Sequence, residues 1–517
     1  MAQVAKTAEE ARLSTHSGDL GALAARGVAW VGISRVVSQG FQWIVNVVLA
    51  RLLFPEDFGI LGMATVFTGL IATVNELGLS AAVIQRKDLE DRHLNAAFWA
   101  SVMMGIVLWA IAAAVSPLVA TFYRAQLVQL VIVISALGFV IGPLSVVHRA
   151  TLDRTLAFNK LAAVEIGGIL LGGISSLALA LLGWGVWSLV VGNLLREAGM
   201  VIVSWYVNRW RPAWRFDLSS FRDLFRFGGN VAGTRVVNYA TANVDYLLIG
   251  RLLGATQFGY YSMAYQLITW PLRHISFLVT KVTFPAFSSI QDDVPRLRRG
   301  YLKSVSYISL ITFPMLAGLI AVAPEFIRTV YTTKWIPAVL PIQVLCVAGL
   351  FKSVGTTVGS VIQSRGQPDI ELKWNLVYLV LITIFVLLGV QYGIVGVAVS
   401  IAILVTLTTP IIQGISNRLI DLSWKDYVRA LIPAILGSVL MLLELIVYKW
   451  FLIFFTPADD LVILCTSVPL GVISYSLMLK LGRVQALEEG WQMFIQLSGS
   501  GMAKLKQKVQ SVGLVAR

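Results

Sequence analysis

Apolar segments of bilayer-spanning length recur along most of the sequence and constrain the fold more than any other feature. A helix that crosses the hydrocarbon core needs about 20 consecutive apolar residues. Hydrophobic residues make up 57% of the chain and charged residues only 13%, and a soluble protein of 517 residues would need far more charge to cover its surface. No segment between the apolar stretches is long enough to bury its own core. The sequence therefore predicts an all-α integral membrane protein without a soluble domain.

We expect about fourteen transmembrane helices. Short clusters of Pro, Gly and charged residues separate them, such as FPED at 54–57 and RGQPD at 365–369. The predicted spans are 27–50, 58–84, 94–122, 127–147, 157–182, 184–208, 228–250, 256–288, 304–323, 337–363, 374–390, 393–416, 427–449 and 460–479.

The distribution of basic residues supports this helix count and sets the orientation. Lys and Arg concentrate on the cytoplasmic side of membrane proteins. If the N-terminus is cytoplasmic and the sides alternate, 29 of the 41 basic residues fall on the cytoplasmic side and six on the opposite side. A miscounted helix would scramble this alternation. We therefore predict a multi-pass membrane protein with both termini in the cytoplasm, and we assign the net charge of +14 to the membrane rather than to nucleic acid.

An internal repeat organises the helices. Residues 34–64 align without a gap on 234–264, with ten of 31 positions identical. Six predicted helices, an even number, separate the two copies, so the halves have parallel topology. The predicted parts are a cytoplasmic N-terminal tail (1–26), an N-lobe of six helices (27–208), a basic cytoplasmic linker (209–227), a C-lobe of six helices (228–416), a C-terminal helix pair (427–479) and a cytoplasmic amphipathic tail (480–517).

Four segments carry a resemblance to a known family. The first is LARLLFPEDFG at 49–59. The others are GRLLG at 250–254 with FGYY at 258–261, FPAF at 284–287, and Lys334-Trp335 running on to RGQPD at 365–369. In this order the chain resembles, over roughly residues 25–420, the polysaccharide transporters. These are the Wzx-type flippases of the multidrug/oligosaccharidyl-lipid/polysaccharide exporter superfamily, and the most similar branch includes exporters for colanic acid and succinoglycan.

The resemblance implies two six-helix lobes around a central cavity that works by alternating access. It also implies a substrate, an undecaprenyl-diphosphate-linked oligosaccharide repeat unit that is turned across the inner membrane for exopolysaccharide or lipopolysaccharide biosynthesis. The expected partners are this lipid-linked oligosaccharide, inner-membrane lipids, a polysaccharide polymerase and chain-length or export proteins, with no nucleic acid and no cofactor.

Polar side chains within the first predicted span form one stripe on an otherwise apolar helix. The spacing of four, three and four residues places them on a single face. The stripe consists of Arg35, Gln39, Gln42 and Asn46. An anion at membrane depth needs fixed cations, and charged residues inside spans usually face the interior of the bundle. We therefore predict that this stripe lines the substrate cavity.

The repeat places a second arginine at the equivalent position of the other lobe. Arg235 and Asn238 begin a comparable stripe that ends at Asp245. Because Arg35 and Arg235 are repeat equivalents, an approximate two-fold axis could direct both guanidinium groups toward one diphosphate, which guanidinium binds bidentately. Arg273, in the cytoplasmic half of the eighth span, is the third cavity candidate.

Structural explanations compete with each of these assignments. Glu76 lies at nearly the same depth as Arg35, so the two could neutralise each other within one lobe. Arg273 could extend to the inner headgroups instead. Glu76, Asp245 and Glu165 are the carboxylates that could couple transport to protons or sodium, and the sequence leaves open whether transport is coupled at all.

Other functions compete with flipping. The four histidines form no motif with cysteines or acids, we expect no metal site, and no P-loop is present, so an enzyme such as a membrane polysaccharide polymerase is disfavoured. A multidrug cation antiporter of the same superfamily would want an acidic cavity, whereas the repeat-related candidates here are arginines. A peptidoglycan-precursor flippase remains an alternative on charge grounds.

Overall fold

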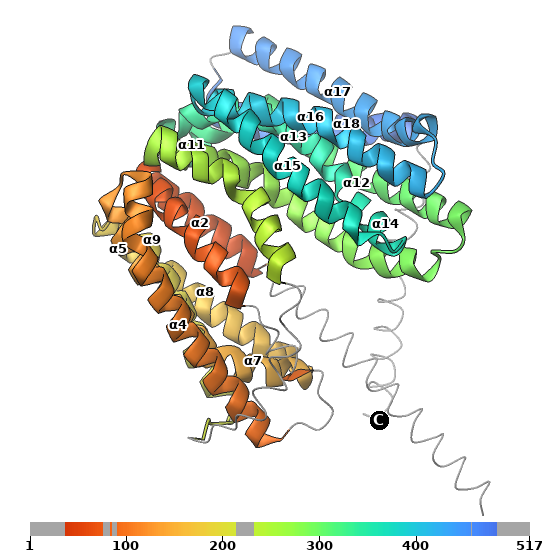
Figure 1. Cartoon of the computed structure of the whole chain (residues 1–517). Helices are drawn as coiled ribbons and strands as arrows, with labels where there is room; N and C mark the ends of the chain where they lie inside the picture. The colour runs from red at the N-terminus through yellow and green to blue at the C-terminus, as the bar shows by residue number, and fades with distance from the viewer. Residues whose placement is uncertain (1–36, 76–82, 85–89, 214–231, 456–457, 483–517) are drawn as a thin grey trace, which may run out of the picture. The chain divides into compact units, whose positions relative to one another are not determined.

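The computed structural model describes residues 37–75, 83–84, 90–213, 232–455 and 458–482 (Figure 1). Within these ranges every element of regular secondary structure is helical, which confirms the predicted fold class. Residues 37–52 form the first described helix. The helices that follow it are α2 (Pro55–Asn75), α4 (Asp91–Tyr123), α5 (Gln126–Ser135), α6 (Gly138–Ile141), α7 (Pro143–Arg154), α8 (Phe158–Leu181), α9 (Val186–Val207), α11 (Ala232–Ser289), α12 (Val294–Phe326), α13 (Val339–Gly355), α14 (Val358–Ser364), α15 (Pro368–Gly389), α16 (Gly393–Leu419), α17 (Trp424–Phe455) and α18 (Asp460–Leu481).

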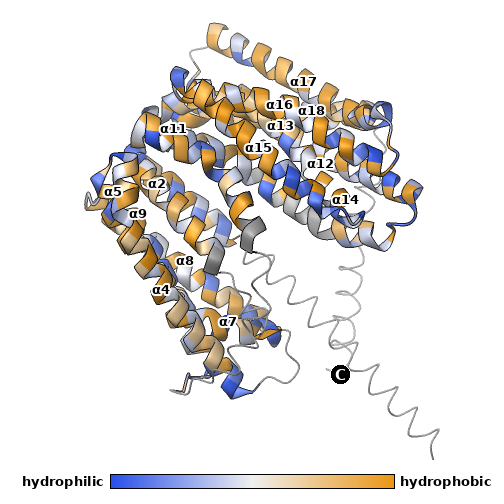
Figure 2. Cartoon of the chain, viewed as in Figure 1, coloured by the Kyte–Doolittle hydropathy of each residue, from blue (hydrophilic) through white to orange (hydrophobic). Residues whose placement is uncertain are grey.

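Many of the described helices, though not α11, have the length and composition of membrane spans. In the described ranges nine helical stretches are long and apolar enough to cross a membrane, or up to ten if the bent pair Gln126–Ile141 and Pro143–Arg154 forms one span. The longest stretch, Pro368–Leu419, contains both α15 and α16 and so covers two predicted spans. Apolar residues predominate along most of the helices (Figure 2). The total of fourteen stays a prediction.

Helix α11 covers the seventh and eighth predicted spans. Its 58 residues are interrupted at Gly254, whose backbone has φ 83° and ψ 179°. This conformation is open to glycine and strained for other residues. Gly254 therefore divides α11 into two arms at the break that the sequence predicts between residues 250 and 256.

The described chain divides into two compact units. One contains the described residues up to 262 together with 378–383, and the other contains 263–377 together with the described residues from 384 to 482. The first arm of α11 thus belongs with the N-terminal helices. The lobe boundaries predicted above follow the sequence repeat instead, and they stay a prediction.

Small residues allow close packing between helices α8 and α9 in the first unit. A Cβ atom on Gly172 of α8 would lie 2.8 Å from the carbonyl oxygen of Gly192 on α9. Gly199 of α9 likewise faces the Cα atom of Gly168 on α8. Glycines bring helix backbones together where lipid provides little hydrophobic driving force. The α8–α9 pair is therefore held by close backbone contact.

A reciprocal glycine contact joins α2 to α11 in the same unit. A Cβ on Gly59 would overlap the backbone carbonyl of Ala255, and a Cβ on Gly259 would overlap the backbone carbonyl of Pro55. Under the offset of 200 found in the sequence repeat, Gly59 corresponds to Gly259 and Pro55 corresponds to Ala255, so the repeat relates one contact to the other. The contact has the form that a local two-fold axis between the repeats would produce.

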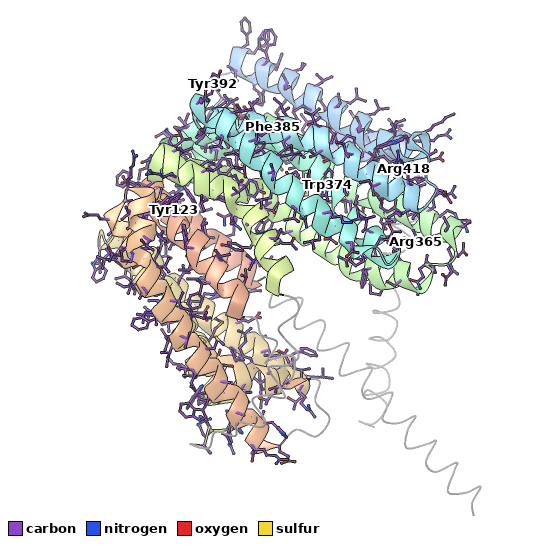
Figure 3. All side chains as sticks on the ribbon, viewed as in Figure 1. Tyr123, Arg365, Trp374, Phe385, Tyr392 and Arg418 are labelled. Atoms are coloured by element: carbon purple, nitrogen blue, oxygen red, sulfur yellow. The ribbon has the colours of Figure 1, made fainter. Side chains whose placement is uncertain are left out.

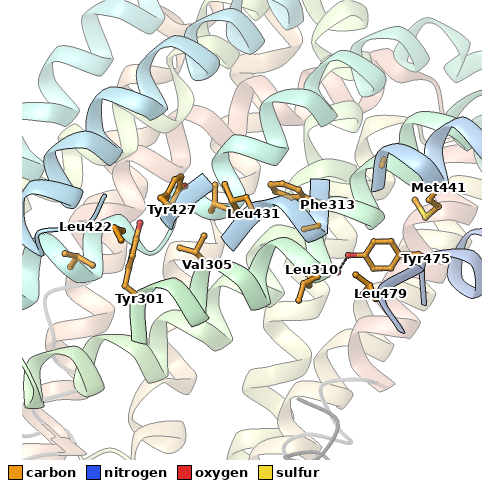
Figure 4. Close-up of a cluster of buried hydrophobic side chains, with 14 of the residues drawn as sticks. Tyr301, Val305, Leu310, Phe313, Leu422, Tyr427, Leu431, Met441, Tyr475 and Leu479 are labelled. Atoms are coloured by element: carbon orange, nitrogen blue, oxygen red, sulfur yellow. Dashed lines mark hydrogen bonds between the residues drawn. The ribbon is translucent and has the colours of Figure 1, made fainter. Parts of the chain in front are cut away.

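The second unit is built on packing between α12, α17 and α18. Tyr301, Phe313, Tyr427 and Tyr475 belong to its buried cluster (Figure 4). The hydroxyl of Tyr475 donates a hydrogen bond of 2.9 Å to the carbonyl of Leu310. The C-terminal helices are thus packed on α12 through a continuous apolar core.

An ion network holds the same helices at one end. Lys449 of α17 lies 2.8 Å from the buried carboxylate of Glu325 on α12, and its Nζ also donates to the carbonyl of Ala321. Arg328 lies 3.7 Å from Glu325 and makes two hydrogen bonds of 2.8 Å to Asp460 at the start of α18. The network therefore connects α12, α17 and α18 with balanced charge.

Candidate functional site

The amide stripe predicted on the first span lies beside a packed face of its helix. Val45 packs with Leu49 against residues of α8 and α9 and is 6% exposed. Gln39 is exposed, whereas Gln42 and Asn46 are half-buried. At 100° per residue these three amides flank the packed face on one side. The three amides therefore share one side of the described helix, and their role in lining a substrate cavity stays a prediction.

The two arginines at the centre of the prediction are not described at the side-chain level. Arg35 and its alternative partner Glu76 lie outside the described residues, and so does the side chain of Arg235. Asn238, one turn beyond Arg235, has an exposed side chain. The paired-arginine cavity stays a prediction.

Tyr239 anchors the first arm of α11 to α2. Its hydroxyl donates a hydrogen bond of 2.9 Å to the carbonyl of Val66 on α2. A tyrosine hydroxyl is normally paired where its ring is buried. This contact and the glycine crossing place α11 alongside α2 over several turns.

Asp245 is almost completely buried, with 2% of its surface exposed. The hydroxyl of Tyr261 donates a hydrogen bond of 2.7 Å to its Oδ2, and the backbone N–H of Tyr246 donates one of 2.9 Å to its Oδ1. Tyr261 and Asp245 lie on opposite sides of the break at Gly254, so this bond connects the two arms of α11. The geometry gives Asp245 a structural task, and its role in ion coupling stays a prediction.

The second unit contains a lysine whose partner the sequence did not reveal. Lys352 reads in the sequence as a lone charge inside a span, but its Nζ donates a hydrogen bond of 2.9 Å to the hydroxyl of Tyr265. The same Nζ lies 4.9 Å from the centre of the tyrosine ring, within range of a cation–π interaction. Lys352 is half-buried in the last turn of α13. It is a cation within Thr333–Ser364, a helical stretch that is long and apolar enough to cross a membrane.

Arg273 and Glu165 are the two remaining candidates from the sequence. Arg273 lies eight residues beyond Tyr265 on α11, about 12 Å along the axis at 1.5 Å per residue, and its side chain is exposed. Glu165 is half-buried on α8. In the described residues no group of three or more His, Cys, Asp or Glu side chains could hold a metal ion.

A bundle of long apolar helices with isolated polar groups at membrane depth defines a multi-pass membrane protein, and solved structures show the same fold. The lipid II flippase MurJ in an inward closed conformation aligns with a TM-score of 0.68 at 14% identity, covering 88% of this chain and 99% of that one. An inward-facing multidrug resistance transporter of the MATE family, from the MOP superfamily, aligns with a TM-score of 0.60 at 16% identity, covering 76% and 98%.

The sequence comparison identifies the family. The model of the polysaccharide biosynthesis protein family matches residues 48–340, more than half of the chain, so the protein belongs to this family. The teichuronic acid biosynthesis protein TuaB of Bacillus subtilis is 30% identical over 71% of this chain and 76% of its own length. The lipopolysaccharide biosynthesis protein WzxC of Escherichia coli is 29% identical over 78% and 83%.

A further relative, the succinoglycan biosynthesis transport protein ExoT of Rhizobium meliloti, is 26% identical over 68% of this chain and 71% of its own. These findings confirm the resemblance stated from the sequence motifs. The protein is a membrane transporter of the polysaccharide biosynthesis family rather than an enzyme.

Proposed function

We propose that this protein turns lipid-linked oligosaccharide repeat units from the cytoplasmic to the opposite leaflet of the inner membrane, for exopolysaccharide or lipopolysaccharide biosynthesis. The observation that carries the proposal is the similarity to WzxC across 78% of the chain, together with the transporter fold. The undecaprenyl diphosphate carrier and the cytoplasmic position of both termini are parts of the same proposal, the latter supported by the basic residues concentrated on one side.

The chemistry of such a substrate explains which side chains a flippase needs. The polyprenyl tail can stay in lipid, whereas the diphosphate and the glycan require a polar path. Arg35, Arg235 and Arg273 would bind the diphosphate, since guanidinium keeps its charge when buried. Gln39, Gln42, Asn46 and Asn238 would hydrogen-bond sugar hydroxyls. Lys352 adds a fourth cation at membrane depth, and its bond to Tyr265 supports a side chain that is already oriented.

Ion coupling and protein partners remain separate proposals. Glu76, Asp245 and Glu165 would be the carboxylates that exchange protons or sodium. A polymerase and chain-length or export proteins would receive the translocated unit. A proton-coupled cycle would require that transport by membrane vesicles depend on the proton gradient.

The experiment that tests the proposal is deletion of the gene followed by analysis of lipid-linked intermediates. We expect a completed repeat unit to accumulate on the cytoplasmic leaflet, because assembly continues while translocation stops. An incomplete unit would point to an assembly enzyme and refute the proposal. Unchanged polymer and altered sensitivity to cationic drugs would favour the multidrug antiporter, and accumulated peptidoglycan precursor would favour that class of flippase.

Complementation with single variants tests the binding residues. We expect Arg35→Ala and Arg235→Ala each to abolish polymer export while the protein still inserts in the membrane. The matched control is Arg92→Ala, which removes an exposed arginine paired with Glu90 at 2.8 Å. Wild-type export from both cavity variants would refute the cationic cavity.

A further inference from the structure

A cavity of about 490 Å³ opens between the end of α16 and the start of α17. Its lining residues are Gly414, Asn417, Arg418, Asp421, Leu422 and Trp424. Arg418 lies at the end of α16 (Figure 3), and Leu422 belongs to the apolar core beside Tyr301 and Tyr427 (Figure 4). The predicted spans twelve and thirteen end at 416 and begin at 427. The cavity thus lies at the predicted membrane boundary, at the depth of lipid headgroups.

A chain of buried hydrogen bonds leads from the core into this cavity. The hydroxyl of Tyr301 donates to Oε1 of Gln413 at 2.9 Å, and Nε2 of Gln413 donates to Oδ1 of Asn417 at 2.8 Å. Asn417 is 3% exposed, and its Nδ2 is buried without a hydrogen-bond partner in the described part of the chain. Buried polar groups normally have a partner. Asn417, a lining residue of the cavity, therefore carries a buried amide nitrogen that lacks an acceptor among the described residues.

Two opposite charges flank this unpaired donor. Arg418 and Asp421 are both exposed cavity residues, and no ion pair joins them in the described structure. Asp421 has a left-handed backbone with φ 49°, and the N–H of Leu422 donates a hydrogen bond of 2.9 Å to the carbonyl of Asn417. The next residue, Ser423, caps α17 by accepting from the N–H of Asp426. The backbone around both charges is thus fixed by hydrogen bonds.

We propose that this cavity binds the headgroup of an aminophospholipid. The phosphate would accept hydrogen bonds from Nδ2 of Asn417 and from the guanidinium of Arg418, and the primary ammonium would pair with the carboxylate of Asp421. The indole of Trp424 suits the interface between headgroup and acyl chains. A simple anion would leave Asp421 facing it as a like charge, so the lining favours a zwitterion over inorganic phosphate or an acidic lipid. The inference does not depend on the transported substrate.

Lipid binding to the purified full-length protein tests this assignment. The probes are undecaprenyl diphosphate, inorganic phosphate, and a pair of phospholipids with the same acyl chains, phosphatidylethanolamine and phosphatidylglycerol. Each probe is titrated into the detergent-solubilised protein. Lipid binding is followed by native mass spectrometry and phosphate binding by calorimetry. We expect the wild type to prefer phosphatidylethanolamine over phosphatidylglycerol by about tenfold, as expected for one additional charge-assisted hydrogen bond. Equal affinity for the two phospholipids, or tighter binding of undecaprenyl diphosphate or phosphate, would overturn the proposal.

Variants separate the two halves of the headgroup. Asp421→Asn should remove the preference while leaving phosphatidylglycerol binding intact or improved. Arg418→Gln should weaken both phospholipids by about tenfold. Asn417→Asp keeps an oxygen that accepts from Gln413 and replaces the unpaired amide nitrogen by a negatively charged carboxylate oxygen, so it should also weaken both. Arg429→Gln, an exposed arginine on α17 outside the lining, is the control and should bind as wild type. A preference that survives Asp421→Asn, or is lost equally in Arg429→Gln, would contradict the assignment.

Discussion

Replacing Lys449 by Met should be among the most destabilising single changes at the end of α17. The Lys449–Glu325 pair spans 2.8 Å, with side chains 14% and 4% exposed. Removing the lysine leaves a buried carboxylate whose remaining cation, Arg328, is 3.7 Å away. Breaking a buried pair typically costs 3–5 kcal/mol. Because Arg328 still compensates in part, we expect a loss of about 3 kcal/mol, at the lower end of that range.

The exposed pair Arg92–Glu90 provides a control at the same distance. Its atoms also lie 2.8 Å apart, but the two side chains are 61% and 57% exposed. Solvent screening limits such a pair to about 0–1 kcal/mol, so Arg92→Met should change stability little. The free energy of unfolding would be measured in mixed micelles by titration with sodium dodecyl sulfate, following tryptophan fluorescence. The comparison isolates burial as the cause of the difference.

A double variant completes the test. Glu325→Gln removes the buried charge, so combining it with Lys449→Met should recover most of the stability that Lys449→Met loses. If Lys449→Met destabilises no more than Arg92→Met, or if the double variant loses the sum of the two single effects, then the network does not hold α17 to α12 in the way described here.

Three further predictions concern other contacts. Gly59→Ala and Gly259→Ala should each cost about 1–3 kcal/mol of stability through overpacking against a backbone carbonyl. The control Gly40→Ala, at a position with no atom within 4 Å, should be neutral in the same titration, and equal effects at all three positions would contradict the close contact between α2 and α11. Tyr261→Phe should lower the free energy of unfolding by about 1–3 kcal/mol, because the buried Oδ2 of Asp245 loses its 2.7 Å hydrogen bond. An unchanged thermal unfolding transition would show that another group satisfies that oxygen. Lys352→Met should lower polymer export while Lys352→Arg retains part of it, measured by complementation at matched membrane abundance, and wild-type export by Lys352→Met would remove this lysine from the proposed path.

Much of the fold could be predicted because its signals are local or periodic. Long apolar helices follow from composition, and the break at Gly254 lies between two predicted spans. The offset of 200 in the sequence reappears in space as the exchange of Gly59 and Ala255 with Gly259 and Pro55. An internal repeat can be detected by aligning the sequence with itself, without any knowledge of tertiary contacts.

The polar contacts could not be predicted because their partners are distant in the chain. Tyr265 precedes Lys352 by 87 residues, and Glu325 precedes Lys449 by 124. Sequence spacing indicates which residues share a helix face, but not which helices meet. The cavity beside Asn417 was missed for the same reason, since its unpaired amide becomes visible only once the bond from Tyr301 to Gln413 is known.

The most direct test of the central claim is translocation by the purified protein in liposomes. A lipid-linked oligosaccharide with a fluorescent glycan would be placed in both leaflets, and the fraction protected from an added glycosidase would be followed over time. The account predicts that the wild-type protein makes the protected fraction accessible, and that Arg35→Ala with Arg235→Ala abolishes this exchange while Arg92→Ala does not. Exchange by the double variant at the wild-type rate, or no exchange by the wild type under any ion gradient, would contradict it.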